Sequence, residues 1–95
     1  MIKNFRCKET ERIFQREYSR RLPTDIQKTA FRKLRMLNRS SSIEDLRVPH
    51  GNRLEALSGS REGQHSIRIN ERWRICFLWR DGSAHDVEIV DYHKG

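Results

Sequence analysis

The residues of this chain that could do chemistry are acids and bases placed beside arginines. Glu55 can act as a general base and His93 as a general acid, because the unperturbed pKa of histidine, about 6.5, lets it carry a proton at neutral pH. Arg68 and Arg74 can bind phosphate oxygens, and Tyr92 can stack on a base or orient a phosphate. Metal-free RNA cleavage needs these groups, since a ribose 2′-hydroxyl attacks the neighbouring phosphate.

Simpler roles are also open for these residues. A histidine near a chain terminus is more often a solvated tail residue, and an arginine on a strand is more often paired with a carboxylate on the next strand, here Glu88 or Asp86. Trp73 and Trp79 are in register with apolar residues, which favours core packing over base stacking. The residue types therefore permit catalysis without establishing it.

Neither the histidines nor the glycines form a ligand-binding pattern. The four histidines are dispersed and lack the paired Cys or His spacing of a zinc site. The five glycines are scattered in predicted turns, and none belongs to a phosphate-binding loop before a helix. We therefore expect no metal ion and no cofactor.

The second half of the chain predicts strands that bring the candidate groups onto one surface. Apolar and polar residues alternate over 53–58, 65–70, 73–80 and 85–92, with turns at 61–63 and 81–82. The side predicted to face the core carries Ile67, Ile69, Ile75, Phe77, Val87 and Ile89. The opposite side presents Glu55, Arg68, Arg74 and Tyr92. Residues 73–80 are apolar on both faces, which predicts a central strand.

A short strand and a helix are predicted at the start of the chain. Residues 2–6 alternate between apolar and polar types, as a strand does. Residues 9–19 have a helical period that places Ile13, Phe14 and Tyr18 on one side. The strand and this helix are expected to pack against the sheet.

A second helix, over residues 25–39, has the clearest periodic signal. Pro23 separates it from the first helix, and Thr24 can cap it. Its apolar face holds Ile26, Ala30, Leu34 and Leu37. Its opposite face is a basic stripe, which consists of Lys28, Arg32, Arg35 and Arg39. The stripe is either a solvated helix face or a surface that binds a polyanion.

This order of elements predicts an α+β fold, with two helices on one face of a mainly antiparallel sheet. A short helical turn is expected over 42–46, between the helices and the sheet. The chain has 95 residues, the length of one domain, which we take as 1–95. Its net charge is +7, and only five of its 20 basic residues are lysines. Because arginine suits bidentate contact with phosphate, the charge indicates a polyanionic partner.

The sequence also bears on the compartment. Cys7 and Cys76 show no Cys-x-x-Cys spacing, and the chain opens without the apolar stretch of a signal peptide. We therefore expect a cytoplasmic protein with reduced thiols. No apolar run approaches the roughly 18 residues of a membrane span, so a transmembrane role is excluded.

Three segments carry a resemblance to a known family. They are residues 52–70, with a Gly-x-Arg-x-Gly turn at 59–63, the pair Trp73-Arg74, and the closing Asp91-Tyr92-His93. With the opening residues 2–5, they resemble the HigB toxins of the RelE/ParE superfamily, which belong to bacterial type II toxin–antitoxin systems. The resemblance covers nearly the whole chain. It implies a RelE/ParE-like fold, in which an N-terminal strand and a two-helix hairpin pack on one face of a curved antiparallel sheet.

The resemblance also implies a function. Toxins of this kind are mRNA endonucleases that act on transcripts in the A site of the 70S ribosome. A HigA-type antitoxin neutralises them, and its helix-turn-helix domain binds operator DNA, so the toxin reaches DNA only indirectly. The positions that match those associated with cleavage are Arg74, Asp91, Tyr92 and His93. Phosphate binding is expected from Arg61, Arg68, Arg72 and the basic stripe.

The chain departs from the family pattern in three places. Some relatives have a histidine where this chain has Glu55, and a lysine where it has Ser58. An arginine expected near Asn70 is replaced in function by Arg68 or Arg72. A carboxylate at position 55 can still act as a base, whereas the missing lysine implies a weaker or differently built phosphate clamp and a slow toxin.

Three alternatives remain open at the level of sequence. Asp91 is equally suited to a direct role and to a structural ion pair with an arginine. Within the same superfamily, a gyrase-inhibiting ParE-like toxin shares the scaffold but needs no catalytic acid or base. From another class, a non-enzymatic nucleic-acid-binding regulator would use only the basic stripe. The ending Asp91-Tyr92-His93 favours cleavage.

Overall fold

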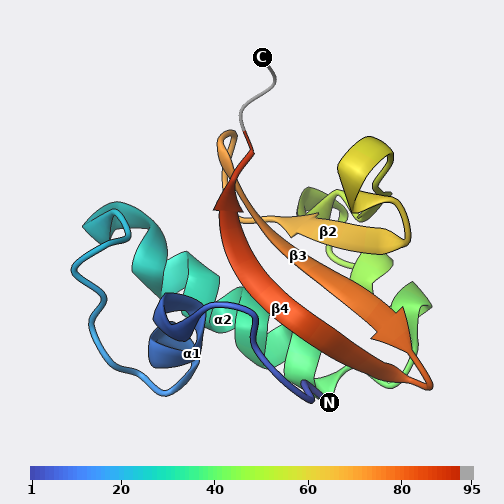
Figure 1. Ribbon diagram of the computed structural model, residues 1–95, viewed down its shortest axis with the longest axis horizontal. Helices are drawn as coiled ribbons and strands as arrows, with labels where there is room; N and C mark the ends of the chain where they lie inside the picture. The colour runs from blue at the N-terminus through green and yellow to red at the C-terminus, as the bar shows by residue number, and fades with distance from the viewer. Residues whose placement is uncertain (93–95) are drawn as a thin grey trace.

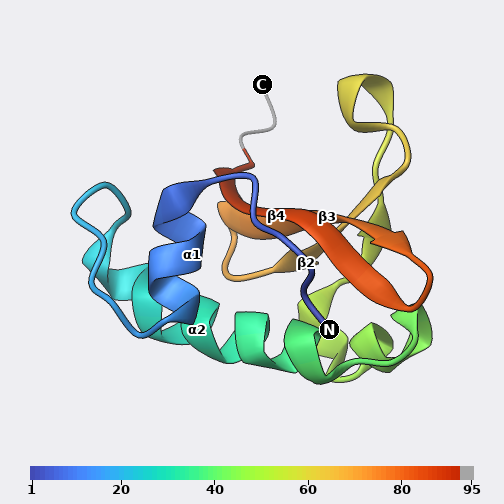
Figure 2. The ribbon, with the colours of Figure 1, turned by 60° about the horizontal axis from the view of Figure 1, so that its bottom comes forward.

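Two helices and a sheet form two layers in the computed structural model, which describes residues 1–92 (Figure 1). The helices are α1 (Lys8–Phe14) and α2 (Thr24–Arg39). The sheet is antiparallel, with the order β1 (Glu55–Ala56), β2 (Gln64–Arg68), β3 (Trp73–Arg80) and β4 (Ser83–Asp91). Figure 2 shows both helices on the same side of the curved sheet. The predicted α+β layout is therefore confirmed.

The longest strand, β3, lies between β2 and β4, as its apolar faces predicted. Asp81 and Gly82 both have positive φ, 52° and 73°, and form the tight turn of the β3–β4 hairpin. The register between these strands shifts after Cys76, and Asp86 on β4 also has a positive φ of 51°. Such an irregularity bends the strands and contributes to the curvature of the sheet.

The core lies between the helices and the concave face of the sheet. All six residues predicted to face the helices are buried there: Ile67, Ile69, Ile75, Phe77, Val87 and Ile89. The apolar face of α2 meets them with Ile26, Ala30, Leu34 and Leu37, which are at most 2% exposed. Trp73 and Trp79 pack against this cluster, which supports their assignment to the core.

Helix α2 agrees closely with its prediction. It begins at Thr24, one residue early, and Pro23 occupies the cap position before it. The Thr24 hydroxyl lies 3.1 Å from the hydroxyl of Tyr18 and makes no capping bond, so its predicted role as a cap is wrong. Within residues 1–92, neither this helix nor any other is long and apolar enough to span a membrane.

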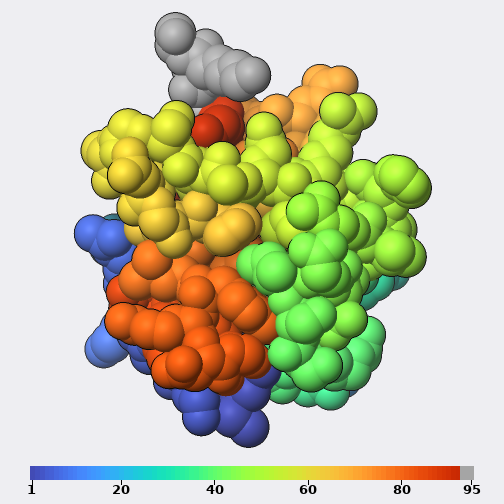
Figure 3. Space-filling view, turned by 90° about the vertical axis from the view of Figure 1, so that its right-hand side faces the viewer, coloured from blue at the N-terminus to red at the C-terminus, as the bar shows by residue number. Residues whose placement is uncertain are grey.

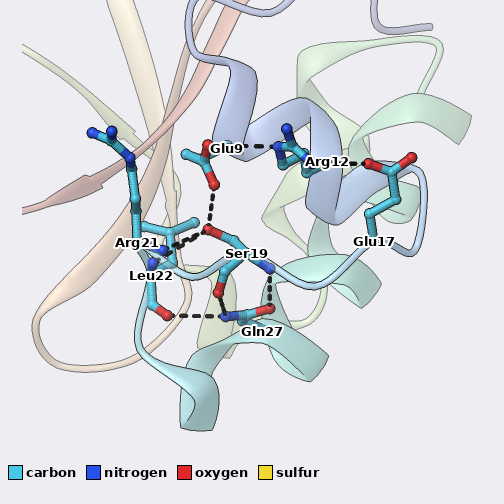
Figure 4. A network of polar contacts seen from close by, with 7 residues as sticks. All are labelled: Glu9, Arg12, Glu17, Ser19, Arg21, Leu22 and Gln27. Carbon is cyan, nitrogen blue, oxygen red and sulfur yellow. Dashed lines mark hydrogen bonds and ion pairs between the residues drawn. The ribbon is translucent and has the colours of Figure 1, made fainter.

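Helix α1 is shorter than the predicted 9–19. It ends at Phe14, because Arg16 adopts the left-handed conformation (φ 64°) and turns the chain. Tyr18 is therefore exposed instead of extending the apolar face. The chain then enters a polar network centred on the fully buried Ser19, whose hydroxyl donates to Glu9 at 2.6 Å and whose backbone bonds with Gln27 (Figure 4).

The predicted N-terminal strand is only partly formed. Ile2 and Phe5 make isolated parallel bridges to Ala84 and Val87 on β4, and no continuous strand runs over residues 2–6. On α1, the buried Thr10 hydroxyl accepts a hydrogen bond from the backbone N–H of Ile89 at 2.9 Å. The start of the chain therefore covers the edge of β4, which would otherwise present unpaired backbone groups.

Three 3₁₀ helices lie around the start of the sheet: η1 (Ile43–Arg47) and η2 (His50–Asn52) precede β1, and η3 (Gly59–Arg61) connects β1 to β2. The first confirms the helical turn expected over 42–46. The predicted strand 53–58 is reduced to β1, since Arg53 takes a left-handed conformation (φ 43°) and the extended run starts only after it. Figure 3 shows this green-to-yellow segment packed along the orange residues of β3 and its turn.

Candidate functional site

An open hollow lies beside the β2–β3 turn and the end of β4, and has a volume of about 780 Å³. Its lining consists of Arg53, Leu54, Glu55, Arg68, Asn70, Glu71, Arg72, Arg74 and Tyr92. Four of these nine residues are arginines and two are glutamates, so the surface is positive. An anionic ligand such as a phosphodiester backbone matches this charge.

Strand alternation brings four predicted residues into the hollow, each from a different place in the sheet. Glu55 comes from β1, Arg68 ends β2, Arg74 is the second residue of β3, and Tyr92 directly follows β4. In the registers of the sheet, Glu55 pairs with Ser66 and Arg68 pairs with Arg74. The sheet therefore positions these groups, and all of them lie on its convex face, away from the helices.

Arg74 is the most enclosed charge of the site, and only 7% of the residue is exposed. Its Nε donates to the Ser66 hydroxyl at 2.6 Å, and its Nη2 donates to the backbone oxygens of Arg53 at 2.5 Å and Ser66 at 3.3 Å. Burial lowers the pKa of Arg74 from its usual value, partly offset by Glu55. A guanidinium nevertheless stays protonated at neutral pH, so the site holds a fixed cation.

Glu55 forms an ion pair with Arg74, with 3.1 Å between Oε1 and Nη2. The glutamate side chain is 51% exposed, whereas the arginine side chain is 8% exposed. The carboxylate thus reaches solvent and the hollow while the guanidinium stays beneath it. Such a carboxylate can accept a proton from a ligand bound in the hollow.

Arg68 lies beside Arg74 as its cross-strand partner and is half-buried. It forms no ion pair within residues 1–92, and its charge contributes to the lowered pKa of Arg74. Two like charges on neighbouring strands repel each other unless an anion lies between them. Their placement therefore favours a bound phosphate.

Tyr92 closes the hollow from the end of β4. The guanidinium carbon of Arg74 lies 5.9 Å from the centroid of its ring, within the range of a cation–π contact. Its backbone N–H donates to the Arg72 carbonyl at 2.7 Å, which fixes the chain at this point. The ring is half-buried and lines the hollow, as a stacking group would.

Asp91 is held by Arg72 in a bidentate ion pair. The guanidinium Nε lies 2.9 Å from both carboxylate oxygens, and Nη2 lies 2.7 Å from one of them. The hydrogen bonds that Arg72 donates to this aspartate, and the negative charge of the aspartate, raise the pKa of Arg72. The geometry favours the structural role that the sequence left open for Asp91, and it engages the charge of Arg72, which had been expected to bind phosphate.

Arg61 also has a carboxylate partner. Its Nη1 donates to Glu88 at 2.9 Å and to Gln64 at 3.0 Å, and it does not line the hollow. Glu88 therefore pairs with an arginine as anticipated, although this arginine comes from η3 instead of a strand. Asp86 accepts a hydrogen bond from Asn4 at 2.7 Å.

Sequence reasoning missed Arg53, Leu54, Asn70 and Glu71 as lining residues. Arg53 contributes its carbonyl to Arg74, and the preceding 3₁₀ helix and its own left-handed conformation place it there. Asn70 accepts hydrogen bonds from the N–H groups of Arg72 and Trp73, both at 2.8 Å. Asparagine in a polar stretch between two strands was the available signal for this turn.

The basic stripe lies on the solvent face of α2, in the helical layer and thus remote from the hollow (Figure 2). Lys28, Arg32, Arg35 and Arg39 are all exposed, and none forms an ion pair with another described residue. The structure thus leaves their charge available to a partner.

His93, the predicted acid, lies outside the described residues 1–92, so its role stays a prediction. Among the described residues, no three His, Cys, Asp or Glu side chains gather as metal ligands would.

Comparisons with known proteins find similarity along nearly the whole chain. The model of a family described as the RelE-like toxin of the type II toxin–antitoxin system HigB matches residues 3–93. Toxin HigB-1 of Vibrio cholerae is 39% identical over 95 residues, which cover 99% of both chains. Endoribonuclease HigB of Proteus vulgaris is 29% identical over 93 residues, 98% of this chain and 100% of its own. An uncharacterized protein of Haemophilus influenzae is 31% identical over 74 residues, 78% of this chain and 72% of its own.

Proposed function

Because this chain belongs to the HigB family of RelE-like toxins from type II toxin–antitoxin systems, we propose that it cleaves mRNA on the ribosome without a catalytic metal ion. It acts as an endoribonuclease, in line with the name of its Proteus vulgaris relative. The observation that carries the proposal is the buried guanidinium of Arg74, held at the hollow 3.1 Å from the carboxylate of Glu55. A fixed cation beside a solvent-accessible base suits an attack on phosphate.

The reaction proceeds by transfer within the RNA. Glu55 takes the proton of the 2′-hydroxyl, whose oxygen attacks the adjacent phosphorus. Arg68 and Arg74 stabilise the negative charge of the phosphorane. The bond to the 5′ oxygen then breaks, and His93, the residue after Tyr92, protonates the leaving oxygen. The products are a 2′,3′-cyclic phosphate and a 5′-hydroxyl, so protons and bonds balance without water or a metal ion.

The ribosome supplies the alignment that the small hollow lacks. The hollow is open and offers few groups that could read a base or straighten the RNA backbone. The basic stripe on α2 faces the other way and binds ribosomal RNA through its four cations, while the hollow receives the mRNA. Both polyanions therefore contact one chain at separate surfaces.

The family implies an antitoxin partner. We propose that this partner is a HigA-type protein with a helix-turn-helix domain, through which the complex contacts operator DNA. Its surface toward the toxin must be acidic, because the toxin carries a net charge of +7 and two basic surfaces would repel each other.

Mapping of transcript 5′ ends tests the proposal. The toxin is induced briefly in cells that lack the antitoxin, and the ends are mapped in translated and untranslated regions. We expect cuts in phase with codons, only in translated regions. Intact mRNA with double-strand DNA breaks would show a gyrase poison instead, and intact mRNA and DNA would show a binding protein without catalysis.

A further inference from the structure

Ser66 is a buried polar residue of β2 to which the sequence assigned no role. Its side chain is 0% exposed, and its hydroxyl accepts the hydrogen bond from Arg74 Nε at 2.6 Å. Within residues 1–92, this is the only hydrogen bond of that hydroxyl. Ser66 lies between the two proposed catalytic groups, because it pairs with Glu55 on one side and with Cys76, two residues beyond Arg74, on the other.

The guanidinium of Arg74 is tethered along one edge only. Of its five N–H donors, the one on Nε goes to the Ser66 hydroxyl, and the two on Nη2 go to the carbonyls of Arg53 and Ser66. Nη2 also forms the ion pair with the Glu55 carboxylate. Nη1 makes no hydrogen bond to any group within residues 1–92. Among the described residues, the only buried side-chain polar atom without a hydrogen-bond partner is Nδ1 of His65. Because Nη1 of Arg74 also has no partner, it must reach solvent. Arg74 lines the hollow, so its Nη1 group is available to a ligand that binds there.

We propose that Ser66 is a positioning residue, whose hydroxyl orients Arg74 so that Nη1 meets the scissile phosphate. The inference rests on the proposed function and deepens it. Without the hydroxyl, Nε loses its acceptor in a site where water does not replace it, and the guanidinium must rotate to find another one. Rotation moves Nη1 away from the phosphate, and small displacements of a charged donor lower the rate of phosphate chemistry strongly.

The first test compares Ser66→Ala with Ser66→Thr, which keeps the hydroxyl. The rate constant of a single turnover and the affinity for ribosomes programmed with mRNA are measured for each. We expect Ser66→Ala to lower the rate constant about 10- to 100-fold with affinity nearly unchanged, and Ser66→Thr to restore most of it. Ser83→Ala is the matched control, because Ser83 is a buried serine of the same sheet that does not line the hollow.

The second test asks whether Ser66 acts through Arg74. In an Arg74→Ala background, Ser66→Ala should lower the rate no further, since the group that it positions is gone. An equal loss in both backgrounds, or a Ser66→Ala variant as fast as the parent, would overturn the inference. If Arg74→Ala itself cleaves at the parental rate, the proposed site fails, which is a distinct result.

Folding is checked by thermal unfolding of each variant. Should Ser66→Ala not fold, Ser66→Cys takes its place, because the thiol fills the same space but accepts hydrogen bonds weakly. The same outcomes then apply: a slow Cys variant with normal ribosome binding supports the role of the hydroxyl, and a fast one contradicts it.

Discussion

Arg68 and Arg74 carry the same charge at neighbouring positions, yet their surroundings differ. Arg74 is enclosed and tethered by three oxygen acceptors, whereas Arg68 is half-buried and has no ion pair within residues 1–92. A lysine at position 74 cannot reproduce the fork of a guanidinium, since its ammonium is a single point donor. The two positions should therefore respond differently to the same substitution.

We predict that Arg74→Lys lowers the cleavage rate constant about 100-fold or more, and that Arg68→Lys lowers it about tenfold or less. The reason is that Arg68 supplies charge, whereas Arg74 supplies charge in a fixed orientation. Single-turnover cleavage on programmed ribosomes measures both variants. Equal losses at the two positions would show that the tether of Arg74 has no importance for the reaction.

The ion pair between Arg72 and Asp91 can be tested by exchange of the two charges. It joins the β2–β3 turn to the end of β4, directly before Tyr92 and His93. We expect Arg72→Asp and Asp91→Arg each to slow cleavage, because the end of β4 and Tyr92 are then no longer held against the β2–β3 turn. The double variant, with the charges exchanged, should recover most of the rate. If it stays as slow as Asp91→Arg alone, the carboxylate itself takes part in the chemistry.

Among the elements, the sheet was easier to predict than the segments around it. The period of two assigned Ile67 and Ile75 to the core and Arg68 and Arg74 to the other face, because alternation is a local property of a strand. The exposed stripe and the buried face of α2 followed in the same way from the helical period. The packing of the helices against the sheet then determines only how completely each of these faces is buried.

Features that depend on distant residues were not visible in the sequence. The end of α1 at Phe14 depends on a left-handed Arg16 and on bonds between Ser19 and Gln27, which lie on different sides of a turn. The choice of Arg72 as the partner of Asp91 likewise spans 19 residues. Periodicity carries no information about such pairs, so helix ends and ion pairs need the structure.

The 3₁₀ helix η1 has a carboxylate that should make stability depend on pH. Asp45 accepts hydrogen bonds from the backbone N–H groups of Ser41 at 3.0 Å and Ser42 at 3.2 Å, and chiefly the former lowers its pKa below the usual 3.8. Because its pKa is lower in the folded state, the carboxylate stabilises the fold above about pH 4 and loses this effect as the pH falls through the lowered value.

We therefore predict that Asp45→Asn is less stable than the parent at pH 7, and that the difference shrinks in strong acid. Urea unfolding at pH 7 and about pH 2 measures it. Asp81→Asn is the control, since Asp81 lies in a turn where asparagine is equally suited, and it should show no such trend. A constant difference at both pH values would mean that the charge of Asp45 is unimportant.

Helix α2 gives a prediction about binding. One variant carries glutamine at all four positions of the basic stripe, Lys28, Arg32, Arg35 and Arg39. Its affinity for the ribosome should be lower and should depend less on the salt concentration, while the cleavage rate constant of the bound complex stays unchanged. A control variant replaces four other exposed basic residues by glutamine, namely Lys3, Lys8, Arg20 and Arg47. If both variants bind alike, net charge alone is responsible and the stripe has no special role.

At the scale of the whole molecule, the positive charge is divided between two layers. The sheet presents the hollow with its four arginines, and the helical layer presents the stripe. A chain with one small core can hold both, because each surface needs only a few side chains on a rigid element. In the proposed function, the ribosome holds the mRNA and thereby aligns the scissile phosphate with the hollow.

In the proposed reaction, the hollow promotes attack by the 2′-hydroxyl of the mRNA on the adjacent phosphate. This step is tested most directly with an mRNA that carries a single deoxyribose immediately 5′ of the scissile phosphate, placed on the ribosome with the otherwise identical ribose transcript as control. We expect the ribose transcript to be cut to a 2′,3′-cyclic phosphate and the deoxyribose transcript to stay intact. Cleavage of both transcripts at similar rates would contradict this mechanism, because the nucleophile would then come from elsewhere.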